Sequence, residues 1–541
     1  MTTQIPALIC GGGPVGLALA IELGTRGVRC MLVEQGDGSV VVPKMSQLST
    51  RTMEFCRRWG IAEEAKQAGW PEHHPGDFIY LTTMTGYELF RQRFTSYAQQ
   101  GDLGYTPDGA RQCPQIFFDP ILLRRAAVLP SVTLRHRARL ESFAEAAQGI
   151  EARVTSLPTG QSEIIEAEYL IGCDGFDGVV RKALNTEYEG SGMLSYSVSI
   201  FFRSRALGEL HDKGWGRFYR LVDGTGHWSD LIAIDGRELW RLTLFHLDPD
   251  SEMAGFDADA ALRRAAGQDF TYEIISVLPW KRRELVAKSY GGGRLFIAGD
   301  AAHQMSPTGG LGMNTGIGDA VDLGWKLAAM IEGWGGAHLL RSYEIERKPV
   351  AVSSVAASSA TYVHETSLPA NRAIADDSAE GIQARQQFAA ALQGRRGAGN
   401  ERLNDSIKLA YCYENSPIVA FDEADKAPAP DKKPIAHCRT GARAPHAWLA
   451  PGVSTLDLFG KGFVLLRFDR AIEVAGLMTA ASARAVPLEI INLDNREIAV
   501  LYQRPLVLVR PDGHVAWRGT ACPDYALALL DQLRGAGAAR H

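Results

Sequence analysis

Residues 5–34 read IPALICGGGPVGLALAIELGTRGVRCMLVE, and this stretch decides the fold of the N-terminal part of the chain. The apolar run 5–10 predicts a strand, the turn Gly11–Gly16 follows at once, and an apolar helix comes next. A second apolar run, 28–33, ends in Glu34. A strand, Gly-x-Gly-x-x-Gly, a helix and a strand that ends in an acid are typical of a dinucleotide-binding unit. The glycines alone would also fit a structural turn.

The residue types of this unit suit the binding of a dinucleotide. Gly11 permits the tight turn, Gly13 lets the backbone approach a pyrophosphate, and Gly16 lets helix and strand pack closely. The amides at the start of the helix face the phosphates. Glu34 lies 18 residues after Gly16 and is expected to accept hydrogen bonds from ribose hydroxyls. The candidate binding residues here are Gly11, Gly13, Pro14, Val15, Gly16, Glu34 and Gln35.

A later stretch, residues 291–331, indicates which dinucleotide is bound. It reads GGGRLFIAGDAAHQMSPTGGLGMNTGIGDAVDLGWKLAAMI. The run 295–298 predicts a buried strand that ends at Gly299-Asp300. The Pro/Gly loop 307–312 leads into a predicted long helix, whose apolar residues recur at spacings of three and four.

These motifs resemble those of the FAD-dependent aromatic hydroxylases, the single-component flavoprotein monooxygenases that include para-hydroxybenzoate and phenol hydroxylases. The family has Gly-Asp-Ala-Ala-His, a Pro-rich loop, Gly-Gly-x-Gly-x-Asn, and Asp-Ala-x-Asn-Leu-x-Trp-Lys-Leu. The motifs stand here at 299–303, 309–314 and 319–327. Asp322 replaces the usual Asn, and Ser306-Pro307 replaces the more common Pro-Pro.

Three further motifs follow the order of the family. Residues 169–181 match its Asp-Gly motif, with Gly178 where Ser is usual. Arg51-Thr52-Met53-Glu54 opens a predicted helix, and Cys113-Pro114-Gln115 precedes another. The resemblance extends over about 350 residues and on through 339–347.

The resemblance implies an FAD site. Asp300, at a strand end, is expected to bond the ribityl chain, although a turn carboxylate is the alternative. Amides at the start of the 312–331 helix are expected to hold the flavin ring and stabilise its reduced anion, because a helix N-terminus favours negative charge by about 0.3–2 kcal/mol. The candidate residues of this loop and helix are Gly310, Gly312, Met313 and Asn314.

Four other residues have competing interpretations. Gln115 resembles the family glutamine that reaches FAD, but a surface position is equally compatible. Arg51 is a candidate for phosphate or flavin contact, as is Lys44, while a solvated arginine is the alternative. Asp174 is expected to help close the pyrophosphate region. His303 fits a packed or a catalytic histidine.

The fold class is α/β, with a Rossmann-like FAD-binding domain, an inserted antiparallel-sheet substrate domain and a C-terminal thioredoxin-like domain. Residues 196–203 and 239–245 alternate in polarity, and Asp235-Gly236 predicts a hairpin turn. The predicted boundaries are 1–75, 105–185 and 285–395 for the FAD domain, 76–104 and 186–284 for the substrate domain, 396–440 for a helical segment and linker, and 441–541 for the C-terminal domain.

The C-terminal segment resembles the thioredoxin-like domain of phenol-hydroxylase-type members. Asp469–Ile472 occupies the place of a redox Cys pair, so we expect no thiol redox activity. Arg504-Pro505 directly precedes a predicted strand, and we expect this peptide bond to be cis, as thioredoxin-like folds place a cis-proline there.

Composition excludes several classes of function. The 541 residues carry 57 Lys+Arg and 62 Asp+Glu, and this net charge of −5 disfavours a nucleic-acid partner. We find no apolar run that predicts a membrane span and no signal peptide. The eight cysteines are scattered, which indicates a cytoplasmic protein with reduced thiols and no metal site. A homodimer is left open.

The predicted function is an FAD-dependent monooxygenase that hydroxylates a phenolic or other electron-rich aromatic substrate. The resemblance implies that NAD(P)H reduces FAD and that O₂ then forms a flavin C4a-hydroperoxide. The chain has no second dinucleotide motif, which disfavours two-domain flavin disulfide reductases. It also lacks the Trp-x-Trp motif of flavin halogenases. An epoxidase or reductase that acts on an alkene, or a non-catalytic FAD-binding assembly protein, remains the alternative.

The substrate side is the least determined part of the sequence. The candidate catalytic residues are Pro307, Tyr219 and His227, the last two as substrate bases. Arg217 and Arg241 lie in the expected substrate sheet or its loops, where an arginine pairs well with a carboxylate.

Overall fold

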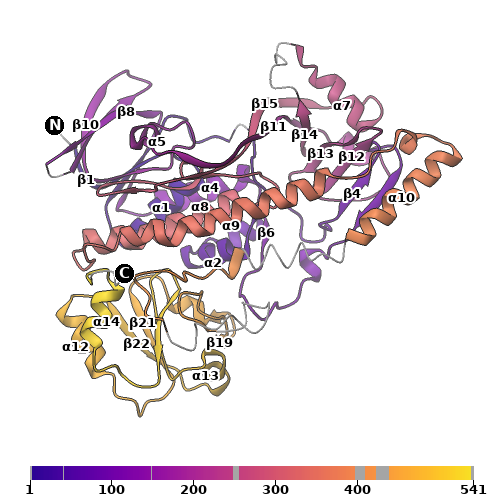
Figure 1. Ribbon diagram of the computed structural model, residues 1–541. Coiled ribbons are helices and arrows are strands. Elements are labelled where there is room, and N and C mark those ends of the chain that lie inside the picture. The colour runs from indigo at the N-terminus through magenta and orange to yellow at the C-terminus, as the bar shows by residue number, and fades with distance from the viewer. Residues whose placement is uncertain are drawn as a thin grey trace.

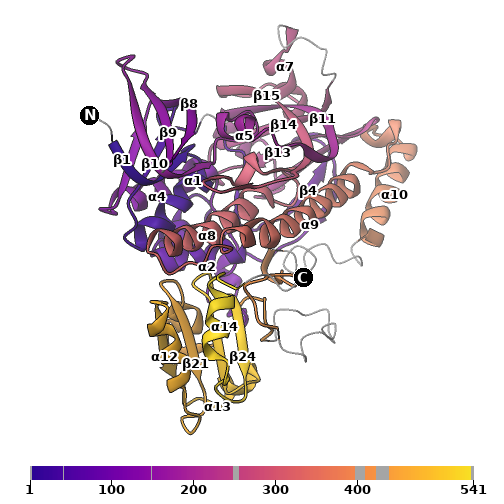
Figure 2. The same ribbon diagram turned by 60° about the vertical axis from the view of Figure 1, so that its left-hand side comes forward.

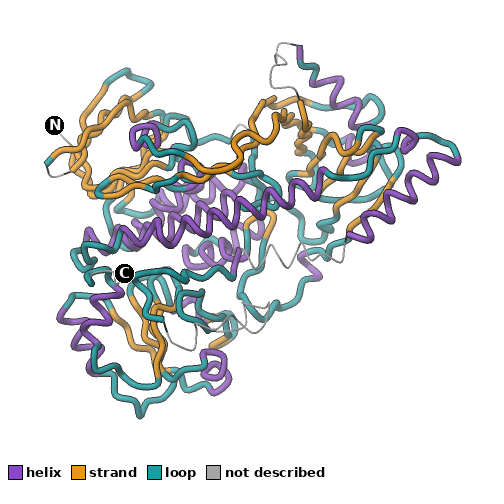
Figure 3. The backbone as a smooth tube through the Cα atoms, viewed as in Figure 1, coloured by secondary structure: helices purple, strands orange, loops and turns teal. Residues whose placement is uncertain are grey.

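The computed structural model describes residues 3–40, 42–147, 149–247, 255–395, 408–421 and 438–537 (Figure 1). Two large sheets stand side by side above a smaller C-terminal domain, and a layer of helices lies between the sheets and that domain (Figure 3). Most of the predicted helical segment and linker, 396–440, lies outside the described residues.

The first sheet is mainly parallel and has the order β16-β17-β10-β1-β2-β7, with β9 beside β10 and β8 beside β9. β1 lies parallel to both β2 and β10, and β10 lies parallel to β17. This is the predicted dinucleotide-binding arrangement. The strands are β1 Thr3–Cys10, β2 Cys30–Glu34, β7 Val132–His136, β8 Ala138–Ala146, β9 Gly149–Ser156, β10 Ser162–Gly172, β16 Gly291–Gly292 and β17 Leu295–Ile297.

Helices cover this sheet and form the largest core. Leu17, Leu19 and Ile21 of α1 and Ile317 and Val321 of α8 are buried in one apolar cluster with the strands. The helices of this part are α1 Pro14–Thr25, α2 Thr50–Trp59, α3 Ala62–Gln67, α4 Gln115–Ala127, α5 Val179–Leu184, α8 Gly312–Ile331 and α9 Arg341–Thr366. The short strands β3 Gln47–Leu48 and β6 Arg111–Gln112 pair with each other.

The second sheet has the order β18-β15-β11-β14-β13-β12-β4-β5. It is antiparallel except that β4 lies parallel to β12, which brings the segment around residues 78–92 into the sheet. The strands are β4 Phe78–Leu81, β5 Glu88–Gln92, β11 Tyr188–Arg203, β12 Phe218–Asp223, β13 Gly226–Ala233, β14 Leu239–Leu247, β15 Glu273–Ala287 and β18 His303–Gln304.

The predicted turn at Asp235-Gly236 connects β13 and β14, and the Asp235 carboxylate accepts three backbone N–H groups there. One face of the second sheet packs against α7, Ala258–Ala266. The other face packs against Val42 and Ile116 of the first part of the chain, so it faces the nucleotide-binding region. The flanking helices are α6 Ala206–Glu209 and α10 Ala379–Arg395.

The C-terminal domain lies below α2 and α8 in both views (Figure 2). Its sheet has the order β22-β21-β23-β24, with β21 parallel to β22 and antiparallel to β23. This order fits the predicted thioredoxin-like fold. Its elements are β19 Trp448–Ala450, β20 Val453–Ser454, β21 Phe463–Arg467, α12 Ala475–Ala483, β22 Leu488–Asn492, α13 Arg496–Tyr502, β23 Leu506–Val509, β24 Val515–Gly519 and α14 Ala526–Leu533.

The predicted cis bond at Arg504-Pro505 is wrong, because no peptide bond among the described residues is cis. The chain is redirected instead at Gln503, which ends α13 in the left-handed conformation with φ 62°. The Pro505 carbonyl then accepts the N–H of Phe468 and aligns β23 with β21. The left-handed conformation of Gln503 therefore makes the turn for which we expected a cis peptide bond at Pro505.

Candidate active site

The glycine-rich turn has the geometry that phosphate binding needs. Gly11 adopts φ 110°, and a Cβ on it would lie 2.4 Å from the Cys173 carbonyl oxygen. A Cβ on Gly16 would lie 2.0 Å from the Gly11 oxygen. No described atom lies within 4 Å of a Cβ built on Gly13. The turn is therefore closed on the sheet side and open at Gly13, where a pyrophosphate would approach.

Glu34 stands at the end of β2 directly beside this turn. Its carboxylate accepts the N–H of Gly12 and the N–H of Gly36, each at 2.6 Å. Gln35 is exposed next to it. The ribose hydroxyls of a bound dinucleotide fit this carboxylate, which two amides already hold in position.

Val15 joins the turn to the second motif, while Pro14 occupies the first turn of α1. The Val15 side chain lies 2.9 Å from a Cβ built on Gly299 and 2.6 Å from one built on Gly316. The glycines at 299 and 316 thus bring the end of β17 and the start of α8 up to the glycine-rich turn.

Asp300 is exposed at the carboxyl end of β17, where the chain turns through a 3₁₀ segment. The N-terminus of α8, at Gly312 and Met313, follows one loop later. An exposed carboxylate and a helix N-terminus on the same side of the sheet fit the ribityl chain and the ring of a flavin.

Asn314 connects the loop before α8 with the start of α2. Its Oδ1 accepts from Ser49 N and Thr52 Oγ1, and its Nδ2 donates to the carbonyls of Gln47 and Gly310. These four bonds use the whole amide. The side chain of Asn314 therefore shapes the loop, and its backbone remains the part available to a cofactor.

Gln115 begins α4 and accepts the Lys44 N–H at 3.1 Å, while its amide donates to Asp119 Oδ2 at 3.0 Å. Burial raises the pKa of Asp119 to about 7, although the hydrogen bond from Gln115 opposes the shift. Asp119 thus orients the Gln115 amide from beneath. The sequence analysis missed Asp119, which lies one helical turn after Gln115.

Asp174 lies under the glycine-rich turn and accepts the N–H of Val180 at 3.1 Å and the thiol of Cys10. Burial raises its pKa above the usual range. A Cβ on Gly178 would lie 2.1 Å from the Asp174 carboxyl carbon, so glycine at this position leaves room for the carboxylate.

Arg51 is buried and engaged in contacts between domains. Its guanidinium donates to Glu54 and to the Asp512 carbonyl of the C-terminal domain, and it lies 4.5 Å from the centre of the Phe55 ring. Glu54 also pairs with Arg443. In this structure Arg51 attaches α2 to the C-terminal domain.

His303 is fully buried and pairs with Asp319 of α8 at 2.7 Å. Asp319 also accepts from Arg347 of α9. These contacts make His303 a packed residue that joins the end of β17 to two helices, which is the first of its two interpretations.

Tyr219, predicted as a candidate substrate base, is wrongly placed for that role. Its ring is buried in the cluster on the α7 side of the second sheet, beside Trp240. Its hydroxyl accepts from Gly216 N and donates to the Gly214 carbonyl. The neighbouring Phe218 instead faces the nucleotide-binding region. Alternation along β12 therefore turns Tyr219 away from the site.

His227 remains on the side that faces the nucleotide-binding region. Its Nε2 lies 2.8 Å from Asp230 Oδ1, and its Nδ1 is buried without a hydrogen-bond partner among the described residues. Burial raises the pKa of Asp230, but His227 and Arg220 outweigh that effect and hold the pKa below its usual value.

Four arginines gather on this face of the second sheet. Arg220 pairs with Glu365 of α9 at 2.7 Å, and Arg241 donates to the Pro43 carbonyl. Arg282 donates to the hydroxyls of Ser306 and Thr308, on either side of the exposed Pro307. The fourth is Arg217. Arg220, Arg282 and Asp230 were missed by the sequence analysis, although strand alternation places them on the face of Arg241.

The comparisons with known proteins agree with this geometry. The family described as "FAD binding domain" matches residues 4–358, and "Aromatic-ring hydroxylase, C-terminal" matches residues 437–536. The FAD-dependent monooxygenase apdD of Emericella nidulans is 32% identical over 95% of this chain and 87% of its own. The 4-methyl-5-nitrocatechol 5-monooxygenase of a Burkholderia species is 30% identical over 98% of this chain and 97% of its own.

Solved structures extend the similarity to the whole molecule. Chromopyrrolic acid-soaked RebC with bound 7-carboxy-K252c superposes with a TM-score of 0.91 at 38% identity, over 99% of this chain and 100% of that one. A complex of aklavinone-11 hydroxylase with FAD and aklavinone gives a TM-score of 0.80 at 27% identity, over 98% and 99% of the two chains.

Proposed function

Because this chain belongs to the FAD-dependent aromatic-ring hydroxylases, we propose that it hydroxylates a phenol-like ring held between the N-terminus of α8 and the second sheet. The enzyme is an NAD(P)H-dependent flavin monooxygenase. The observation that carries the proposal is the exposed Asp300 one loop before the α8 N-terminus, in a loop whose Ser306 and Thr308 accept hydrogen bonds from Arg282 of the second sheet. Since NAD(P)H is supplied in the cytoplasm, we place the reaction there.

FAD is bound by residues of the first sheet. Gly13 leaves room for the pyrophosphate. Glu34 accepts hydrogen bonds from the ribose hydroxyls, and Asp300 forms hydrogen bonds with the ribityl chain. The amides of Gly312 and Met313 hold the ring and offset negative charge on it. Bound FAD supplies the transfer of electrons from NAD(P)H to O₂ and of one oxygen atom to the substrate.

The second sheet holds the substrate. His227 serves as the base that takes the phenol proton, through its free Nδ1, while Asp230 fixes the ring through Nε2. A phenolate ring is richer in electrons than the neutral phenol, so it reacts more readily with an electrophilic oxygen. Both residues are buried, so the protein shields the reacting ring from water.

The test is to load the purified protein with FAD and to follow NAD(P)H oxidation with a panel of mono- and polycyclic phenols. We expect at least one phenol to stimulate oxidation and to gain one oxygen atom, identified by mass spectrometry with ¹⁸O₂. Oxygen incorporation into polyenes but not phenols would identify an alkene epoxidase instead. Bound FAD without any turnover of NAD(P)H would favour a non-catalytic assembly protein.

A further inference from the structure

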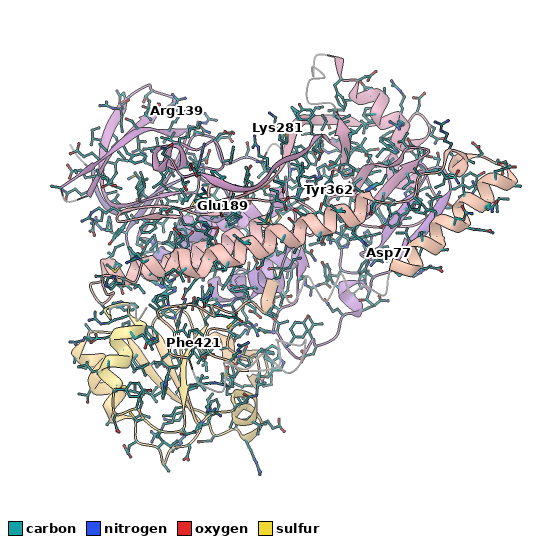
Figure 4. All side chains as sticks on the ribbon, viewed as in Figure 1. Asp77, Arg139, Glu189, Lys281, Tyr362 and Phe421 are labelled. Carbon is teal, nitrogen blue, oxygen red and sulfur yellow. The ribbon has the colours of Figure 1, made fainter. Side chains whose placement is uncertain are left out.

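A pocket opens at one end of the second sheet, between α7 and the 3₁₀ turn Arg372–Ala375 that precedes α10. Its volume is about 290 Å³. Asp77, labelled in Figure 4 beside α10, marks the start of β4, the strand that leads to the pocket. Pockets that hold small molecules measure about 300–1,000 Å³, so this one suits a ligand of one or two rings.

The pocket lies beyond the carboxyl ends of two parallel strands, β4 and β12. Thr82 and Thr83 directly follow β4, and Asp223 ends β12. An irregularity in the pairing of β12 with β13 turns Trp228 toward α7, whereas its neighbour His227 faces the nucleotide-binding region. No residue that we assign to FAD or to the substrate lines the pocket, so it is a site of its own.

Apolar and aromatic side chains form the base of this pocket. Val222 is fully buried there, and Trp228 is 9% exposed. The Arg264 guanidinium lies 3.9 Å from the centre of the Trp228 ring. The Tyr87 ring also lines the pocket, and the Arg385 guanidinium lies 3.8 Å from its centre. Flat surfaces of this kind favour an aromatic ligand, because a ring stacks on aromatic and guanidinium planes alike.

Two hydroxyls converge on one side of the pocket, at the turn between β4 and β5. A Cβ built on Gly86, which lines the pocket, would lie 2.2 Å from the Thr82 hydroxyl oxygen and 2.7 Å from that of Thr83. Thr82 accepts the N–H of Tyr87 at 3.0 Å, while the Thr83 hydroxyl forms no hydrogen bond with another described residue. A hydroxyl both donates and accepts, so this side of the pocket suits a hydroxyl of the ligand.

The two charged side chains of the pocket neutralise each other. Arg264 pairs with Asp223, and Asp223 also accepts from the backbone N–H and the hydroxyl of Thr225. No other charged side chain lines the pocket. An ionic ligand would therefore have to break an existing ion pair, whereas a neutral ligand leaves it intact.

We propose that this pocket is a second small-molecule site, which binds a neutral hydroxyarene of one or two rings. The apolar base takes the ring, and the two threonine hydroxyls bind the hydroxyl group. The inference does not depend on the proposed function, although under that function both the substrate and the product are hydroxyarenes. The competing explanation is a surface hollow that holds only water.

The experiment titrates the FAD-loaded enzyme with 2-naphthol by calorimetry, without NAD(P)H, and counts the bound molecules. The change in flavin absorbance reports separately on a molecule next to the flavin. We expect the wild type to bind one molecule of 2-naphthol more than Ala375→Trp, because residue 375 is exposed at the pocket and an indole there would fill it. Thr83→Val keeps the shape of the side chain and removes its hydroxyl, so it should weaken this binding about 2- to 10-fold. Neither variant should alter the flavin titration.

Ala390→Trp is the matched control, because Ala390 is exposed on α10 and does not line the pocket. It adds the same side chain and should keep the additional molecule. FAD content and melting temperature establish that each variant is folded. 2,3-Dihydroxynaphthalene, titrated in parallel, tells the two sources of a hydroxyarene apart. Tighter binding than that of 2-naphthol indicates a ligand like the product, and weaker binding indicates one like the substrate.

Equal numbers of bound molecules in the wild type and Ala375→Trp, including no binding at all, overturn the proposal. If Ala375→Trp does not fold, an unchanged affinity in Thr83→Val overturns it instead. Tighter binding of 2-naphthoate than of 2-naphthol at this site also overturns it, because the ligand would then be an anion. Binding is measured without turnover. Failure to hydroxylate any phenol would therefore count against the proposed function alone.

Discussion

Gly13 and Gly16, three residues apart in the glycine-rich turn, are needed for different physical reasons. A Cβ at position 16 meets the backbone oxygen of Gly11 at 2.0 Å, whereas a Cβ at position 13 meets no described atom within 4 Å. Gly16 is required by the protein's own packing, whereas Gly13 leaves open the space in which we propose that the FAD pyrophosphate binds.

We predict that Gly16→Ala lowers the stability of the apoprotein by about 1–3 kcal/mol, because the backbone of the turn must shift. Gly13→Ala should leave the melting temperature of the apoprotein unchanged and lower FAD affinity at least tenfold. Thermal unfolding and FAD titration of both variants test this. A Gly13→Ala variant that binds FAD normally would place the pyrophosphate elsewhere.

Asp119 predicts a pH dependence with a definite sign. Its pKa in the folded protein is about 7, against 3.8 in the unfolded chain, so the folded state keeps a proton that the unfolded state releases. The free energy of unfolding therefore falls as pH rises from about 4 to 7. Below about pH 4, Asp119 is protonated in both the folded and the unfolded state, so it no longer lowers the free energy of unfolding.

Asp119→Asn removes this proton linkage and keeps the acceptor for Gln115. The free energy of unfolding of the variant minus that of the wild type should rise by about 2–4 kcal/mol from pH 4 to pH 8. Urea unfolding at the two pH values measures it. An equal difference at both would show that Asp119 ionises normally.

At the scale of elements, α8 and α9 enclose a buried ionic cluster that the C-terminal domain completes. Arg510, fully buried, bonds Glu346, Asp322 and Asp512, and Lys326 bonds both Asp322 and Glu346. Three carboxyls thus face two cations. Burial and the neighbouring Glu346 raise the pKa of Asp322 well above its usual value, which balances the charges if Asp322 keeps its proton.

A protonated Asp322 is nearly isosteric with asparagine, the residue at this place in the family motif that residues 319–327 resemble. We predict that Asp322→Asn changes the free energy of unfolding at pH 7 by less than about 1 kcal/mol. Arg510→Met, the contrasting variant, should lose about 3–5 kcal/mol because it leaves buried carboxylates unpaired. A large loss in Asp322→Asn, measured by urea unfolding, would show that Asp322 is ionised.

At the scale of the whole molecule, the C-terminal domain contributes contacts to α2, α8 and α9. Its cysteines, Cys438 and Cys522, form no disulfide among the described residues, and Asp469–Ile472 contains no cysteine. We predict that the Cys438→Ser, Cys522→Ser double variant keeps its FAD and its full rate of hydroxylation. A folded double variant that binds FAD but no longer hydroxylates would reveal a redox role for this domain.

Much of this architecture could be predicted from local patterns. Three patterns depend only on a few neighbouring residues, and the structure shows all three as expected. They are the glycine-rich turn, the strand that ends at Asp300 and the alternation in β11 and β14. Alternation tells which residues share a face of a strand but not what covers that face, so it could not show that Tyr219, a candidate substrate base, packs on the α7 side. The partner of Arg51 lies some 460 residues away in the chain, at Asp512, and no local pattern reveals it.

The long helix α9 has a consequence for how such enzymes diversify. It spans about 39 Å, with Glu346 in the cluster beside the C-terminal domain near one end and Glu365 against Arg220 near the other. A chimera that exchanges only the C-terminal domain with a relative would separate Arg510 from the α9 that evolved with it. Exchange of this domain would therefore call for compensating changes in α9, whose other end holds Glu365 against Arg220 of the second sheet.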